Sequence, residues 1–195
     1  MKNLDFNNDF IWKFQERQSV LEQLIHDEGI LTEAQLLYGK FHDCFFRGNK
    51  LIFCGNGGSA ADCQHIVAEF IVKLSQMRRA LPAISLTSNN SVITAISNDI
   101  DYEAIFIRQL EGIAKPHDIL IGISTSGNSQ NIINSFQYAR ENDIYTVSVT
   151  GNNKSKLWCL ADTRLIIPSK NTQIIQEVYL MIFHVLCEKL EEFYE

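Results

Sequence analysis

Two short loops rich in glycine and hydroxyl side chains are the segments of this chain best suited to bind a ligand. Residues 55–60 read Gly-Asn-Gly-Gly-Ser-Ala, and residues 124–129 read Ser-Thr-Ser-Gly-Asn-Ser. Each follows an apolar run, at 51–54 and 119–123, and each leads into a helical pattern. Glycine lets backbone N–H groups face a ligand, hydroxyls add donors, and a helix N-terminus adds partial positive charge. Together the loops predict a cradle for a phosphate or another small anion.

His65 and Glu69 lie one helical turn apart after the first loop, so both side chains project from one face. An imidazole and a carboxylate at this spacing can hold a divalent metal, and they can equally serve as an acid–base pair. For the pair alone, an ordinary hydrogen bond across the turn is the favoured explanation; the neighbouring cradle shifts the interpretation toward chemistry. The last helical segment adds Gln176, Glu177 and His184. His184 lies in an apolar run, where a core histidine is usual.

A dinucleotide site is the main alternative for the first loop. Gly55, Gly57 and Ala60 fit the permissive Rossmann spacing. That site also needs an acidic residue about 20 positions further on to bind the ribose, and residues 75–81 read Ser-Gln-Met-Arg-Arg-Ala-Leu. A 2′-phosphate held by either arginine would leave the second loop unexplained. The sequence therefore disfavours a dinucleotide.

Apolar periodicity supplies the elements that must position these residues. Two N-terminal helices are expected at 9–27 and 32–47, the second with Thr32 as its N-cap. From residue 50 onward, strands and helices alternate, which is typical of a parallel sheet with helices on both faces. Ligands of such sheets bind beyond the carboxyl ends of the strands, where both loops lie. The expected strands are 51–54, 83–87, 118–123, 144–149 and 164–167, and the expected helices are 59–76, 91–98, 101–114, 129–141, 153–160 and 172–193.

Length and composition indicate one soluble domain spanning 1–195, with residues 1–48 packing on the sheet and on neighbouring subunits. The net charge of -6 disfavours nucleic acid as a partner, and no apolar run is long enough to cross a membrane. The five cysteines are widely spaced and mostly lie in apolar stretches, as free thiols do in a reducing compartment. The first ten residues lack a signal-peptide pattern, so a cytoplasmic protein is expected.

The terminal helical segment favours an oligomer. It is apolar on more than one face over residues 174–186, so it must be buried on several sides. Gln176 and His184 are eight residues apart, about 12 Å along a straight helix, and one helix would strain to present both to one ion. A symmetric interface between subunits solves both problems. The prediction is a homotetramer with active sites at subunit contacts.

Several segments combine with the loops and the His/Glu pair into one pattern: residues 55–62, His65-x-x-x-Glu69, residues 81–86, Asn98-Asp99, residues 122–129, and Ile175-Gln176-Glu177 with His184. This pattern resembles the phosphoheptose isomerases of the sugar isomerase (SIS) domain family, from about residue 10 to the C-terminus. The resemblance implies an α/β three-layer sandwich with a flavodoxin-like five-stranded parallel sheet, extra N-terminal helices and a homotetramer. It also implies conversion of sedoheptulose 7-phosphate to D-glycero-D-manno-heptose 7-phosphate, for nucleotide-activated heptose in bacterial surface polysaccharide.

The resemblance also implies roles for single residues. Glu69 matches the base and His184 the acid of an isomerase that works through an enediol(ate). His65, Glu69, Gln176 and His184 match the ligands of a zinc ion, which need not be essential; the ligand and base roles of Glu69 compete. The expected contacts to the sugar phosphate are Asn56, Gly57, Gly58, Ser59, Asn98, Asp99, Ser124, Thr125, Ser126, Ser129 and Gln176.

The chain departs from the family pattern at three positions, with Lys73 and Ile174 in place of arginine and Asp101 in place of glycine. Lysine keeps the charge but loses the planar fork, so these changes bear on substrate choice. The alternative function is a non-catalytic SIS-fold tetramer that binds a protein such as a replication initiator. Such a scaffold would not need the four polar side chains of the zinc site together. A sugar-phosphate-sensing transcription regulator would need a DNA-binding module, for which this chain has neither the length nor the basic charge.

Overall fold

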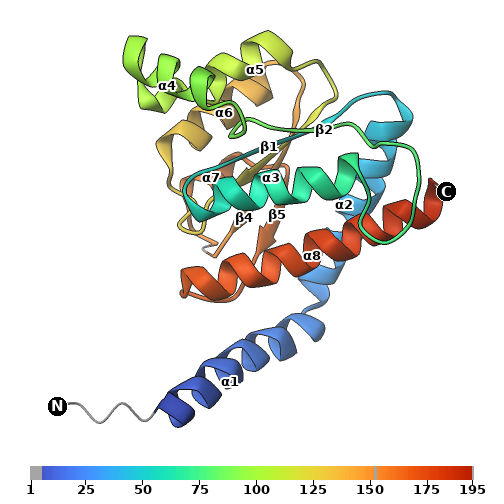
Figure 1. The fold of residues 1–195 in the computed structure, drawn as a ribbon, viewed down its shortest axis with the longest axis vertical. Helices are drawn as coiled ribbons and strands as arrows, with labels where there is room; N and C mark the ends of the chain where they lie inside the picture. The colour runs from blue at the N-terminus through green and yellow to red at the C-terminus, as the bar shows by residue number, and fades with distance from the viewer. Residues whose placement is uncertain (1–5, 152, 195) are drawn as a thin grey trace.

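A computed structural model of the chain describes residues 6–151 and 153–194, so the predicted single domain includes residues 1–5, 152 and 195 that lie outside the described part. Its centre is a five-stranded sheet in the order β2-β1-β3-β4-β5 (Figure 1). All neighbouring strands pair in parallel. This is the flavodoxin-like order, which confirms the predicted fold class and differs from the Rossmann order. The strands are β1 Leu51–Gly55, β2 Ala83–Ser85, β3 Ile119–Ile123, β4 Tyr145–Thr150 and β5 Thr163–Ile166.

The register between β1 and β3 places the two predicted ligand loops side by side. Gly55 at the end of β1 is the register partner of Ile123 at the end of β3. The strand order reverses between these two neighbours, and such switch points form the ligand crevice of open α/β sheets. Both loops therefore begin at the same level of one edge, as a shared anion cradle requires.

Helices cover both faces of the sheet (Figure 1). Alternate residues of β1 serve the two faces: Leu51 and Phe53 pack with α2, α3 and α8, whereas Ile52 and Cys54 pack with α4, α5, α6 and α7. The first helix, α1, extends away from the rest of the domain. The helices are α1 Phe6–Ile25, α2 Glu28–Phe46, α3 Gly58–Ile71, α4 Asn90–Asp99, the 3-10 helix η1 Tyr102–Ala104, α5 Ile107–Ile113, α6 Gln130–Glu141, α7 Lys156–Leu160 and α8 Thr172–Phe193.

One predicted helix start is wrong because an aspartate caps an earlier position, and one predicted helix is divided in two. Thr32 is not an N-cap: α2 begins one turn earlier, with the Asp27 carboxylate accepting from two backbone N–H groups, and the Thr32 hydroxyl donates to the Glu28 carbonyl instead. The predicted helix 101–114 is divided into η1 and α5. Asp101 caps η1 with its side chain, which gives this departure from the family pattern a local structural role.

The predicted helix 59–76 also ends early, at Ile71. The backbone N–H groups just beyond it bind the carboxylate of Glu191 on α8 rather than continuing the helix. The predicted strand 83–87 and helix 153–160 are shorter as well, as β2 and α7. Remaining boundaries agree within a few residues, the usual scatter of helix and strand ends.

The cysteines follow the prediction of mostly buried thiols. All five are free; Cys159 is exposed and the other four are buried. Among the described residues, none of the helices has the length and hydropathy needed to cross a bilayer.

Candidate active site

Two helices begin at the predicted cradle without a side-chain cap. Gly57, with φ 58°, is the N-cap of α3, and Ser129 is the N-cap of α6; neither side chain bonds the first turn. Within the described chain the short α5 shares this feature. The first N–H groups of α3 are thus free of side-chain acceptors, as are those of Gln130 and Asn131 in α6, whereas the Ile132 N–H donates to Asn131 Oδ1 at 2.9 Å. Free N–H groups at a helix N-terminus are what an anion site requires. By contrast, side chains cap α2, α4, α7 and α8: Asp27, Asn89, Ser155 and Asn171.

The loop after β3 gathers two hydroxyls. Ser124 Oγ lies 3.0 Å from Ser129 Oγ and accepts from the Gly127 N–H at 3.1 Å. Gly127 has φ 67°, and a Cβ there would lie 2.3 Å from Ser155 Oγ, so only glycine fits this turn. Ser126 is exposed, and its hydroxyl accepts a hydrogen bond from the Asn128 N–H. Ser124 and Ser129 thus form one donor pair, with Ser126 at the rim.

A cavity of about 850 Å³ borders the same loop. Thr125 and Ser126 line it from one side, and Lys170, just past the end of β5, lines it from another. Asp27 also reaches this cavity. Lys170 is not among the residues predicted from the sequence, although a basic residue at the carboxyl end of a strand is a signal for an anion site at this edge.

A second group of polar side chains forms where α3 and α8 lie against each other. His184 Nε2 on α8 lies 3.3 Å from His65 Nε2 on α3. His65 Nε2 in turn lies 3.4 Å from Glu69 Oε1, and these two side chains are 52% and 20% exposed. The fold therefore brings the predicted base, the predicted acid and one further predicted ligand into contact at a solvent-accessible position.

Gln176 does not join this group within the chain. A Cβ at Gly58 would lie 2.5 Å from Gln176 Nε2, so the amide sits beside the start of α3. The spacings from His65 to His184 and Glu69 match the edge of a tetrahedral zinc site, about 3.3–3.4 Å for ligands at about 2.0–2.1 Å from the metal. In the described part of the chain, however, no three His, Cys, Asp or Glu side chains are arranged to hold a metal ion.

The side chain of Asn56 in the first loop is held by a reciprocal amide pair. Asn56 and Asn131 donate to each other, both at 3.0 Å, and the Tyr102 hydroxyl donates to the same Asn56 oxygen at 2.9 Å. Asn56, Gly57 and Tyr102 line a cavity of about 410 Å³ at the carboxyl ends of β1 and β2. Asn131 and Tyr102 are not among the residues predicted from the sequence. A signal existed for Asn131, which is a polar residue at an inward position of the amphipathic α6.

Ser59 is buried, and its hydroxyl is hydrogen bonded to a side chain of α8. The Tyr179 hydroxyl lies 3.1 Å from Ser59 Oγ and also bonds the Asp62 carboxylate. Burial and the bond to Asp62 raise the pKa of Tyr179 far above its ordinary value, so this phenol stays protonated. The predicted phosphate contact of Ser59 is therefore coupled to the packing of α8 on α3.

The remaining predicted residues lie apart. Asn98 and Asp99 are exposed at the end of α4, where the Asn98 amide donates to the Asp99 carboxylate at 2.7 Å, and no described contact joins them to the loops. Lys73 is exposed just beyond α3. Ile174 is 0% exposed within the core, so this departure from the family pattern is a packing residue rather than a lost substrate contact.

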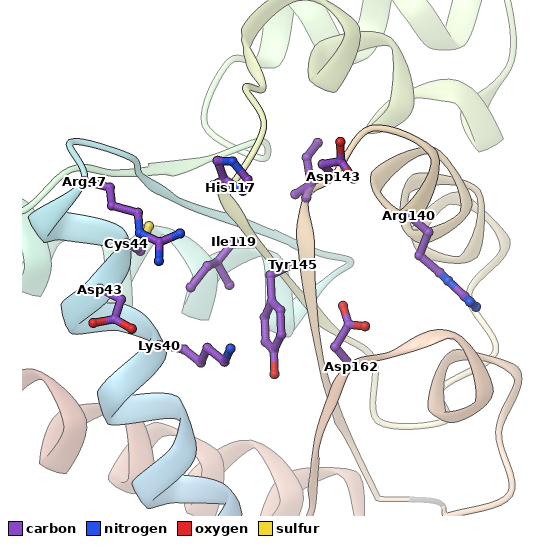
Figure 2. A pocket seen from close by; sticks show the side chains of 11 residues that line it. Lys40, Asp43, Cys44, Arg47, His117, Ile119, Arg140, Asp143, Tyr145 and Asp162 are labelled. Atoms are coloured by element: carbon purple, nitrogen blue, oxygen red, sulfur yellow. The ribbon is translucent and has the colours of Figure 1, made fainter.

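Another cavity, of about 390 Å³, lies at the opposite, amino edge of the sheet (Figure 2). Lys40 and Arg47 from α2 face Tyr145 and Asp162 across it, below His117. Its lining mixes positive and negative side chains and includes none of the predicted site residues. The candidate anion site is therefore the cradle at the carboxyl edge.

Comparison with known proteins agrees with this fold. The model of the SIS domain family matches residues 14–151. The chain is 48% identical over 147 residues to the phosphoheptose isomerase of Synechocystis sp., covering 75% of this chain and 76% of that one. It is 44% identical over 173 residues to that of Clostridium acetobutylicum, covering 88% and 87%. The solved phosphoheptose isomerase of Neisseria gonorrhoeae matches with a TM-score of 0.87 and 30% identity, covering 94% of this chain and 98% of that chain.

The parallel sheet and the family match together define a SIS domain. Within that class, the chain belongs to the phosphoheptose isomerase family, which confirms the resemblance seen in the sequence.

Proposed function

We propose that this chain interconverts sedoheptulose 7-phosphate and D-glycero-D-manno-heptose 7-phosphate, on a route to nucleotide-activated heptose for bacterial surface polysaccharide. Membership of the phosphoheptose isomerase family supports the reaction class. The observation that carries the proposal is the contact between His184 of α8 and His65 of α3, which lies next to Glu69. His65 and Glu69 belong to the helix that begins at the anion cradle.

Aldose–ketose isomerisation moves one proton between adjacent carbons. In the proposed mechanism Glu69 takes the proton and returns it to the neighbouring carbon, while His184 donates to the carbonyl oxygen and stabilises the charge of the enediolate. The hydroxyls of Ser124, Ser126 and Ser129 hold the phosphate with the N–H groups of the loops. These contacts fix the sugar so that the carbon to be deprotonated faces Glu69.

One zinc ion per site is part of the proposal. His65, Glu69 and His184 would hold it, with Gln176 as the fourth ligand predicted from the sequence. The spacings of 3.3 and 3.4 Å around His65 support this set. Because no three such side chains of the described chain are arranged to hold a metal, the set would close only when subunits assemble. Bound zinc would act as a Lewis acid on the sugar oxygens. Glu69 cannot bind zinc and take the substrate proton at the same time. Proton transfer in this mechanism is therefore assigned to Glu69 and His184, and not to the metal.

A homotetramer with sites at subunit contacts completes the proposal. Glu69 lies eleven residues after Gly58, about 16 Å along α3, so either the sugar phosphate extends along the helix or the cradle of one subunit serves Glu69 of another. Several apolar side chains of α1, including Phe10, Trp12 and Phe14, are more than half exposed in the single chain. Their exposure supports an assembly in which they are buried against other subunits. An apolar groove between α1, α2 and α8, lined by residues such as Met181 and Val185, supports the same assembly.

Cytoplasmic localisation is the remaining part of the proposal, and four buried free thiols support a reducing compartment. No observation favours the non-catalytic scaffold. The decisive test is incubation of the purified protein with sedoheptulose 7-phosphate, followed by NMR of the sugar. We expect an equilibrium mixture of ketose and aldose phosphates. Absence of turnover by the folded protein, with and without added zinc, would reject the proposed function.

A further inference from the structure

An ion pair between Arg78 and Glu191 is buried where the end of α3 meets α8. Arg78 Nη2 lies 3.3 Å from Glu191 Oε1, and the two side chains are 0% and 1% exposed. Charges removed from water are costly unless both are well paired and hydrogen bonded. The other contacts of this pair therefore identify what it holds in place.

Arg78 caps the C-terminal end of α3. Its Nη2 donates to the Glu69 carbonyl at 2.7 Å, and its Nη1 donates to the Phe70 carbonyl at 2.8 Å. The last carbonyls of a helix have no partner within the helix, and a cation there also meets the negative end of the helix dipole. One of the two carbonyls belongs to the residue that we assign as the catalytic base.

Glu191 holds the loop that follows α3. Its carboxylate accepts from the N–H groups of Leu74 at 2.6 Å, Ser75 at 2.8 Å and Gln76 at 3.1 Å. Burial raises the pKa of Glu191, but these donors and Arg78 outweigh burial, so its pKa lies below the ordinary value. Glu191 also lies seven residues, two turns, after His184, so both side chains face α3.

We propose that Arg78 and Glu191 position the base of the isomerase: the pair fixes the backbone of Glu69 relative to His184, so that the carboxylate stays within reach of the substrate proton. This inference rests on the proposed role of Glu69. A displacement of about 1 Å at a reacting group can cost about 100-fold in rate. The pair contacts neither anion loop, so binding of the phosphate does not depend on it.

The test uses Arg78→Lys, which keeps the charge but not the fork that caps two carbonyls, and Glu191→Gln, which keeps the shape. Both should lower kcat by about tenfold or more and leave KM within about twofold. Glu191→Asp, which keeps the charge, should recover part of kcat and serves in place of Glu191→Gln if that variant does not fold.

Asp118→Asn is the matched control. Asp118 is also a buried carboxylate that accepts from backbone N–H groups and pairs with Lys50, but it lies at the amino edge of the sheet. It should lower the melting temperature without changing kcat or KM.

Two results overturn the positioning role: unchanged kcat in folded Arg78→Lys and Glu191→Gln, or an equal loss of kcat in Asp118→Asn. Glu69→Gln separates this from the base assignment. A fully active Glu69→Gln removes Glu69 as base and the positioning role with it. An inactive Glu69→Gln beside fully active Arg78 and Glu191 variants removes the positioning role alone.

Discussion

Gln176 and His184 both project from α8 toward α3, but Gln176 reaches its first residue whereas His184 reaches its middle. Gln176 lies beside Gly58, the first residue of α3, and His184 lies beside His65, two turns further along. The two helices therefore run side by side in the same direction. One chain consequently presents its polar side chains as two groups rather than as one closed metal site.

His65→Ala and His184→Ala should each lower the zinc content of the purified protein by at least tenfold. Loss of a group behind a metal ligand already costs about 10–100-fold in affinity, and loss of a ligand costs more. Metal content is measured by mass spectrometry after dialysis against a weak chelator. His42→Ala is the control, because His42 packs on Phe193 and Tyr194 away from the site. Equal zinc in all three variants would show that the metal is bound elsewhere or not at all.

Glu69→Gln should lower kcat by at least about 100-fold, because an amide cannot take the substrate proton. KM should stay within about twofold, since the phosphate contacts are intact. The assay follows conversion of sedoheptulose 7-phosphate by NMR. Glu111→Gln, at an exposed carboxylate paired with Arg108 on α5, is the control and should behave as wild type. Normal turnover by Glu69→Gln would move the base to another residue, and Asp99 and Glu177 would be tested next.

Ser124→Ala should raise KM about 10–100-fold, because a hydrogen bond to a charged phosphate contributes about 1.5–3 kcal/mol. Ser148→Ala is the matched control. Ser148, on β4, is likewise buried, but its hydroxyl has no partner among the described residues. Steady-state kinetics on both variants decide the matter, and an unchanged KM for Ser124→Ala contradicts the cradle.

Mixing inactive Glu69→Gln and His184→Gln subunits should restore part of the activity if each site takes these residues from different chains. Light scattering should give a tetramer for the wild type. Replacing Phe10 and Phe14 with glutamate should dissociate it, because these side chains are 51% and 59% exposed in the single chain and need a partner surface. A fully active monomer at micromolar concentration would contradict the assembly. A tetramer without complementation would keep the assembly and place His184 and Glu69 of one site in one chain.

A maleimide should label Cys159 alone in the folded protein at pH 8. Burial raises the pKa of the Cys44, Cys54 and Cys187 thiols to about 12. These groups are therefore protonated and unreactive well above neutral pH, because only the thiolate attacks. Mass spectrometry counts the labels, and the denatured chain, which should take five, is the control. Rapid labelling of a second site in the native protein would show that the core opens.

Local sequence determined the sheet and the position of the loops. The alternation of apolar runs and helical patterns after residue 50 leaves few arrangements, because parallel strands need crossover helices. Gly55 and Ile123 both end parallel strands, so the two loops that follow them must lie at the same edge of the sheet. Because β1 and β3 are neighbours, the two loops also lie next to each other. The spacing of His65 and Glu69 on one helix was equally a local property.

Only the tertiary structure decided which distant groups meet. The contact of His184 with His65 and the pairing of Asn131 with Asn56 join residues 119 and 75 positions apart, which no local pattern reports. Helix α3 ends at Ile71, although the pattern continues, because Glu191 from the far end of the chain takes the next backbone N–H groups. Periodicity records which face of a helix is apolar, whereas the partner of a buried polar group depends on how the helices pack.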